Sequence, residues 1–243
     1  MSLAVRKMQS FAQRIFVAEA MDDPACDGEK LGRTYAHLAI INKALSRMGG
    51  LLRRYVLDDA ARAGRPVTVL EIGCGSGDVL ASLARASARA RIDVRLVGLD
   101  RDPRAVARAR QILAPYPNAR VDQGGIDDLA MLSEQPDYVF CNHVLHHIPP
   151  DDLVPFLRKL RLAARRRLLV NDLERSAVAY GLYTLLAGVA FHKSFVFADG
   201  RLSIRKGFRV PELEAACVQA GFPPGFRVER MAPWRVVLTA DGG

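Results

Sequence analysis

The sequence predicts an α/β fold in which a doubly wound, mostly parallel sheet carries helices on both faces. From about residue 67 onward, short apolar runs alternate with stretches of helical periodicity. This alternation is typical of parallel strands joined by crossover helices. Strands are predicted at residues 67–72, 94–99, 119–121, 137–141 and 167–170, with helices at residues 79–90, 103–113 and 210–221 and from Pro150 onward. Residues 226–230 and 235–239 are predicted to be two paired strands.

Two segments lie outside this alternation. Residues 1–60 are predicted to be helical because a stripe recurs at three- and four-residue spacing, formed by Leu31, Tyr35, Leu38, Asn42, Leu45 and Met48. Residues 173–207 place a helical stretch and a loop after the fifth strand. We interpret residues 1–60 as a helical cap and residues 61–243 as the main domain, with residues 173–207 as a lid insert. For residues 1–60 a contact in a homodimer is the alternative.

Composition excludes several classes of protein. The chain has 243 residues, of which 50% are hydrophobic and 25% charged, enough for one large domain. No run reaches the roughly 18 apolar residues of a membrane span, and residues 1–10 lack a signal-peptide core. The four cysteines form no CxxC pair, so we expect no metal site and a reducing, cytoplasmic location. The net charge of +9 is spread over many helices, densest at Arg165–Arg167, which disfavours a nucleic-acid partner.

A glycine-rich turn follows the first strand, with the sequence Glu71-Ile72-Gly73-Cys74-Gly75-Ser76-Gly77. Glycines let the backbone turn sharply and approach a ligand closely. The turn lacks the Gly-Lys-Ser/Thr ending of a phosphate-binding P-loop. Asp100 ends the second strand, where a carboxylate can bind both hydroxyls of a ribose. A nicotinamide dinucleotide is the nearest rival, but Asp78 in the first helical turn would repel its pyrophosphate. The combination favours S-adenosylmethionine (SAM), which has no phosphate.

Four segments together resemble the class I SAM-dependent methyltransferases. They are VLEIGCGSGDV at residues 69–79, VGLD at residues 97–100, DYVFCNHVLHHI at residues 137–148, and FRVPEL at residues 208–213. More narrowly, they are similar to the small-molecule branch that includes ubiquinone-biosynthesis, sugar and polyketide-tailoring enzymes. The resemblance covers roughly residues 65–240. It implies a Rossmann-like sheet of seven strands whose last strand is antiparallel.

The resemblance also implies roles for individual residues. The backbone around Gly73, Gly75 and Gly77 would hold the methionine end of SAM, with Glu71 ordering the loop. Asp100 would bind the ribose and Arg101 would lie over the adenine. Beside Gly125, Ile126 and Asp127 would close the adenine end, although the family often has Asp directly after this glycine. Asn142 would face the methionine portion.

Three histidines, His143, His146 and His147, cluster at the end of the fourth strand, where the acceptor is expected. A hydroxyl acceptor is a poor nucleophile, so a nearby base helps. Some sugar and indolocarbazole O-methyltransferases carry a similar Leu-His-His pair, and their proposed bases map onto His146 and His147, with Asp172 as the orienting acid. Packing against the sheet is the alternative for each histidine. His192, in the insert, is a further candidate, with a solvated histidine as its alternative.

The insert is also rich in aromatic residues, namely Tyr180, Tyr183, Phe191, Phe195 and Phe197. They suggest a planar or lipophilic small-molecule acceptor, with ordinary helix packing as the alternative. The sequence therefore predicts methylation of a small aromatic, phenolic or polyketide-type acceptor, with O-methylation favoured. Carbon methylation of a quinol is the main alternative; an RNA-modifying enzyme and a non-catalytic SAM-binding module are further ones.

Overall fold

The structure is a computed structural model that describes residues 11–191 and 193–243. The expectations for residues 1–10 and for His192 lie outside the described residues. Seven strands form one sheet in the order β3-β2-β1-β4-β5-β7-β6. Their bounds are β1 (Val67–Ile72), β2 (Val94–Asp100), β3 (Ala119–Gln123), β4 (Tyr138–Asn142), β5 (Arg167–Leu173), β6 (Arg227–Met231) and β7 (Arg235–Asp241).

Strands β1 to β5 pair in parallel, whereas β7 is antiparallel to both of its neighbours, β5 and β6. From β1 the chain adds β2 and then β3 on one side of the sheet, and it then crosses back to place β4 on the other side of β1. This change of direction between β1 and β4 leaves a crevice at the carboxyl edge of the sheet. The predicted fold class is therefore confirmed, including the antiparallel last strand.

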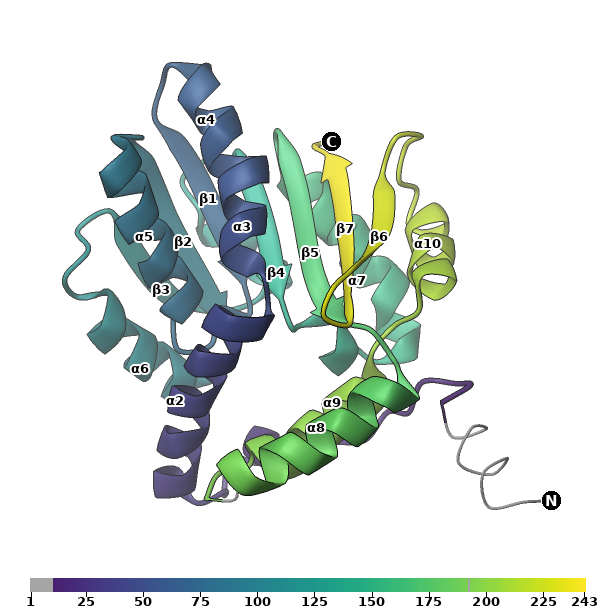
Figure 1. Cartoon of the computed structure of the whole chain (residues 1–243). Helices are drawn as coiled ribbons and strands as arrows, with labels where there is room; N and C mark the ends of the chain where they lie inside the picture. Colours follow the sequence, from purple (N-terminus) through teal and green to yellow (C-terminus); the bar gives the residue numbers. More distant parts are fainter. Residues whose placement is uncertain (1–10, 192) are drawn as a thin grey trace.

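The helices cover the two faces and the carboxyl edge of the sheet (Figure 1). Before the sheet come α2 (Gly28–Leu45), α3 (Met48–Leu52), the π-helical turn η2 (Arg53–Leu57) and α4 (Asp58–Ala63). The crossover helices are α5 (Asp78–Ala90), α6 (Pro103–Leu113), α7 (Pro150–Ala163) and α10 (Val210–Gln219), and the insert holds α8 (Ala177–Ala190) and α9 (Val196–Lys206). Short 3-10 turns are η1 (Ala20–Asp22), η3 (Ile126–Met131) and η4 (Leu145–His147).

Alternation along each strand divides the core into two layers. In β1, Leu70 and Ile72 pack on the side of α7 and α10, whereas Val67 and Val69 pack on the side of α3, α5 and α6. Successive side chains of a strand point to opposite faces, so a strand covered on both faces is apolar throughout. With both faces covered by helices, the carboxyl edge is where the sheet can offer a site.

Beyond that edge lie α8 and α9, with α2 beside them (Figure 1). The sequence predicts one helical stretch and a loop here, but the structure has two helices, and Asp199-Gly200 lies inside α9. Gly200 is needed for close packing, because a Cβ atom there would lie 2.1 Å from the hydroxyl oxygen of Tyr183. Among the described helices, none has the length and hydrophobicity that crossing a membrane requires.

The arginine cluster before β5 forms ion pairs at the other end of the sheet. Arg165 donates to Asp137, which is 1% exposed and also accepts from Arg65 and the backbone N–H of Thr68. Burial raises the pKa of Asp137, but these donors outweigh that effect and hold it below its ordinary value of 3.8. Asp137 therefore joins the segments that precede β1, β4 and β5.

Replacing Asp137 by Asn is expected to lower the free energy of unfolding by about 2 kcal/mol at pH 7, because the arginine partners are half exposed. A depressed folded-state pKa means that this stabilisation is complete above pH 3.8 and is lost as the pH falls through the folded-state pKa. The difference between wild type and variant should therefore shrink in urea unfolding curves measured at pH 7, 4 and 3. Asp241→Asn, at an exposed pair with Arg167, is the control. A difference independent of pH would contradict the assignment.

Candidate functional site

A cavity of about 250 Å³ lies at the carboxyl edge of the sheet. Its walls come from the glycine loop after β1, the turn after β4, the segment from η1 to α2, and the helices α8 and α9. Arg235, the first residue of β7, also lines it. Segments far apart in the sequence thus share one cavity.

The glycine loop has a backbone that only glycine adopts easily. Its φ angles are 68° at Gly73, 52° at Gly75 and 76° at Gly77. A Cβ atom on Gly73 would also lie 2.5 Å from a methyl carbon of Val144. The N–H of Gly75 donates to the Asp100 carboxylate at 2.8 Å, which ties the loop to the end of β2. Residues at these positions are therefore fixed by backbone geometry and close packing.

Three carboxylates gather around this loop. Glu71 is 2% exposed and lines the cavity together with Asp78, while Asp100 lies beneath the loop. Burial raises the pKa of all three, most strongly for Glu71, whose pKa the charges of Asp78 and Asp100 raise further. One Glu71 oxygen has no hydrogen-bond partner among the described residues. This end of the cavity is therefore suited to a ligand with positive charge.

A chain of side-chain amides connects α2 to the sheet. Asn42 donates to Asp78 at 3.1 Å and accepts from Asn142 at 3.2 Å, and Asn142 accepts from Asn171 at 2.7 Å. Sequence reasoning placed Asn142 in the site but not Asn42. The signal that could have found Asn42 is its polar side chain within the mostly apolar stripe of α2. Through this chain, α2 fixes the side chains that follow β1 and β4.

The turn after β4 holds His146 against the end of β5. His146 Nδ1 lies 2.7 Å from Asp172 Oδ1, and its backbone N–H donates to the other carboxylate oxygen at 3.2 Å. The backbone N–H of Leu173 also donates to Asp172. His146 and Asp172 are 2% and 0% exposed. The sequence-predicted pair is thus in direct contact, and His146 lines the cavity.

Burial and hydrogen bonding keep His146 neutral and Asp172 ionised. Burial lowers the pKa of His146 below 6.5, although Asp172 opposes the shift. For Asp172, burial raises the pKa, but the interaction with His146 outweighs burial and holds the pKa below its ordinary value. At neutral pH the arrangement is therefore a neutral imidazole beside an ionised carboxylate. With Nδ1–H donating to Asp172, Nε2 is the nitrogen that can accept a proton.

Comparison with known proteins agrees with this geometry. Residues 69–166, which contain the glycine loop, Asp100 and the histidine turn, match the family model described as a methyltransferase domain. Residues 69–166 therefore carry a methyltransferase domain. No curated protein sequence matches the chain.

Solved structures share the fold of this methyltransferase over almost its full length. The plantazolicin methyltransferase BpumL, in complex with a pentazolic analogue and SAH, has a TM-score of 0.65 at 12% identity, covering 98% of this chain and 96% of that one. An O-methyltransferase family protein from Burkholderia thailandensis gives 0.64 at 12%, covering 99% and 68%. Magnesium protoporphyrin IX methyltransferase from Synechocystis PCC 6803, with bound SAH, gives 0.56 at 15%, covering 100% and 95%. The TM-scores show a common fold, whereas identities this low say nothing about the acceptor, which must be argued from the site.

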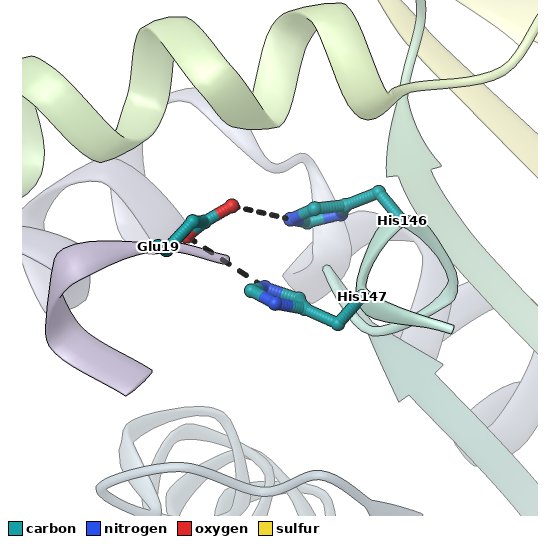
Figure 2. A group of neighbouring side chains, drawn as sticks. All are labelled: Glu19, His146 and His147. Atoms are coloured by element: carbon teal, nitrogen blue, oxygen red, sulfur yellow. Dashed lines mark ion pairs between the residues drawn. The ribbon is translucent and has the colours of Figure 1, made fainter. Parts of the chain in front are cut away.

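The methyltransferase also places a glutamate over its histidine turn. Figure 2 shows Glu19, from the segment before η1, facing His146 and His147. Its carboxylate oxygens lie 3.9 Å from Nε2 of each ring. Glu19 is 4% exposed, and its Oε1 accepts from Lys206 at 2.9 Å and from Ser203 at 2.7 Å. Glu19 lies in no motif and could not be found from the sequence.

The ligand atoms of Glu19, His146 and His147 all lie within 4.8 Å of one another, which is close enough to hold a metal ion. The buried ammonium of Lys206, however, already neutralises Glu19 and lies 3.5 Å from His147 Nδ1. Even a unit positive charge about 4 Å from that ammonium would be repelled by about 4 kcal/mol. We therefore assign the cluster to ion pairing.

His147 differs from His146 in its charge state. Burial lowers its pKa, but Asp22, 3.5 Å from Nδ1, and Glu19 outweigh burial and raise the pKa above 6.5. A histidine that tends to be protonated is a poor proton acceptor, so the structure favours His146 for that role. His143 faces Arg235 instead, with its Nε2 2.5 Å from the guanidinium.

The residues expected at the adenine end do not line the cavity. Arg101 pairs with Asp127 at 3.0 Å, and Asp127 also pairs with Lys159. Ile126 is 4% exposed within the core, and the N–H of Gly125 is bound by Asp128. Their roles toward adenine stay predictions from the resemblance.

Most aromatic residues of the insert pack the helices together. Tyr183 lines the cavity, but Phe195 packs beside Tyr35 of α2, and Tyr180 contacts Phe11 with ring centroids 5.4 Å apart. Phe191 contacts His37 with the two rings tilted by 50°, and Phe197 lies against Gly188. The alternative of ordinary helix packing therefore describes these four residues better than an aromatic wall.

Replacing Lys206 by Met is expected to lower the free energy of unfolding by about 3 to 5 kcal/mol, because it leaves the buried Glu19 carboxylate without a counter-charge. The double variant Glu19→Gln/Lys206→Met leaves no unpaired charge and should recover much of that loss. Urea unfolding of the two single variants and the double variant measures this coupling. Losses that simply add would show that the two side chains are not coupled.

Proposed function

We propose that this methyltransferase moves the methyl group of SAM to an oxygen of a small phenolic, enolic or polyketide-type acceptor. The observation that carries the proposal is that the glycine loop and a neutral His146, held by Asp172, line the same cavity. SAM, when bound, supplies an already activated methyl group. The protein then needs to align the acceptor, exclude water and remove a proton.

The acidic end of the cavity fits the cofactor. We assign Asp100 to the ribose hydroxyls, and Gly73, Gly75 and Gly77 to the methionine portion. Glu71 and Asp78 place negative charge around these glycines, which suits a ligand that bears an ammonium and a sulfonium. The unpartnered oxygen of the buried Glu71 carboxylate supports this fit. The chain of amides through Asn142 would hold the glycine loop in a fixed position relative to the acceptor side of the cavity.

The other end of the cavity fits a small and largely apolar acceptor. Its apolar lining comes from Leu38, Ile41 and Leu45 of α2 and from Tyr183, Val196 and Ile204 of α8 and α9. Since α2 and the insert supply these walls, we propose that residues 1–60 act as a cap and residues 173–207 as a lid over the domain at residues 61–243. Such walls would exclude water from the reacting atoms.

At this end His146 would act as the general base and Asp172 as its positioning residue. With Nδ1–H bound to Asp172, Nε2 would take the proton of the acceptor hydroxyl as oxygen attacks the methyl carbon. The same base would serve carbon methylation of a quinol, which also begins with loss of a hydroxyl proton. Incubation with labelled SAM and a panel of phenols, quinols and pyrones, followed by NMR of the products, separates the two. Binding of SAM without turnover of any panel member would reject this acceptor class.

Asp100→Ala is expected to weaken SAM binding about 100-fold or more, because two charge-assisted hydrogen bonds to ribose are lost. Isothermal titration calorimetry with SAM measures the effect. Asp122→Ala, a partly exposed carboxylate at the adjacent strand β3, is the matched control and should bind SAM normally. Normal affinity in the Asp100 variant would remove the ribose assignment.

His146→Ala is expected to lower kcat about 100-fold while SAM affinity stays nearly unchanged. For the wild type, kcat should rise with pH through the His146 pKa, which lies below 6.5, because only the neutral ring accepts a proton. That rise should be absent in the variant. His37→Ala, on α2 and outside the cavity lining, is the control. If His146→Ala and His147→Ala both retain wild-type turnover, the base assignment is wrong.

A further inference from the structure

Arg235 is a buried cation to which the proposed function assigns no role. It is 3% exposed, begins β7 and lines the cavity. Its Nη1 donates to His143 Nε2 at 2.5 Å, and its Nε donates to the carbonyl oxygen of Leu45 at 3.2 Å. Both partners are uncharged, since burial and the nearby guanidinium hold the pKa of His143 well below 6.5.

No carboxylate among the described residues pairs with this guanidinium. The buried arginine Arg175, in contrast, pairs with Glu212. Burial lowers the pKa of Arg235 to about 10, although the charge of Asp172 opposes the shift, so the side chain is still charged at neutral pH. A buried charge that no carboxylate contacts directly is costly, and a ligand that pairs with it would reduce that cost.

The third nitrogen of Arg235, Nη2, is the donor that remains for a ligand. Nη2 makes no hydrogen bond to any described residue, yet it is not among the fully enclosed atoms that lack a partner. Because the side chain is almost wholly buried, the space that Nη2 reaches is the cavity that Arg235 lines. One donor of a charged group thus faces the ligand space.

Sheet order places this donor on the acceptor side. β7 follows β4 and β5 in the sheet, so it lies three strand intervals from β1, roughly 14 Å from the strand that carries the glycine loop. The hydrogen-bond partners of Arg235 are the His143 side chain and the Leu45 carbonyl, on the turn after β4 and the end of α2. The cavity thus has Glu71 and Asp78 beside the glycine loop, and the cation Arg235 lies on the far side of β4 and β5 from that loop.

We propose that Arg235 binds an oxyanion of the acceptor, so that the preferred acceptors are acidic small molecules. This inference rests on the proposed function, because it assigns the acceptor end of the same cavity. The oxyanion is either a carboxylate or an ionised phenol or enol. Both accept charge-assisted hydrogen bonds from a guanidinium, and both complete the buried charge.

Matched pairs of small probes test the proposal without turnover. Benzoate is compared with benzamide, and 4-nitrophenolate with 4-nitroanisole, by calorimetric titration into SAH-saturated protein at pH 8. We expect the charged member of at least one pair to bind about tenfold tighter or more. Preference for benzoate identifies a carboxylate, and preference for 4-nitrophenolate an ionised hydroxyl. Equal binding within both pairs would overturn the proposal on the wild type alone.

Variants then test whether Arg235 causes the preference for the charged probe. Arg235→Met should reduce it to near unity, and Arg235→Lys should keep part of it. Arg227→Met, the same change at an exposed residue of the neighbouring strand β6, should leave it intact. A preference that survives in Arg235→Met, or loss of SAH affinity in that variant, would overturn the proposal. Absence of SAH binding to the wild type would instead reject the proposed function, which keeps the two failures distinct.

Discussion

The buried ion pair between Glu19 and Lys206 connects the segment before α2 to the end of α9, directly above the histidine turn. Both side chains are nearly inaccessible to water, so each charge depends on the other. Asp199 adds to the connection by accepting from the backbone N–H groups of Ala20 and Met21. The cavity is enclosed only while these contacts hold, because its apolar walls come from the elements that they join.

The cavity offers carboxylates to the positively charged cofactor and a guanidinium to the proposed anionic acceptor. Carboxylates surround the glycine loop, Glu19 paired with Lys206 faces the neutral His146, and Arg235 begins β7, three strand intervals from β1. A buried site cannot rely on water to screen a ligand's charges, so the protein must supply each complement itself. The same burial that keeps His146 neutral also strengthens every other electrostatic contact in the cavity.

Much of this arrangement follows from local sequence. Alternating apolar runs identified the sheet, and the resemblance added the antiparallel strand. The glycine loop could be found because a backbone of this shape needs glycine. Asp100 could be found because it is the residue that ends the second strand. The pairing of His146 with Asp172 was expected because parallel strands end at one edge.

Other residues could not be predicted, for a common physical reason. Glu19, Lys206 and Arg235 act through contacts between elements that are distant in the sequence, and no local pattern encodes such contacts. The second helix of the insert was missed for the same reason, because Gly200 inside α9 packs against Tyr183 of α8. The adenine end is where the resemblance was weakest, and there the expected side chains pair with one another.

The position of β7 has a consequence for how the chain is made. This strand lies between β5 and β6 but is synthesised after both, so the sheet cannot be completed before residues 235–241 are available. Glu19 precedes Lys206 by 187 residues, which at ribosomal rates corresponds to roughly 10 to 40 s. During that interval the amino-terminal segment has no buried partner and its carboxylate stays in water. Assembly of the cavity therefore waits until α9 and β7 have been synthesised, long after the segment around Glu19.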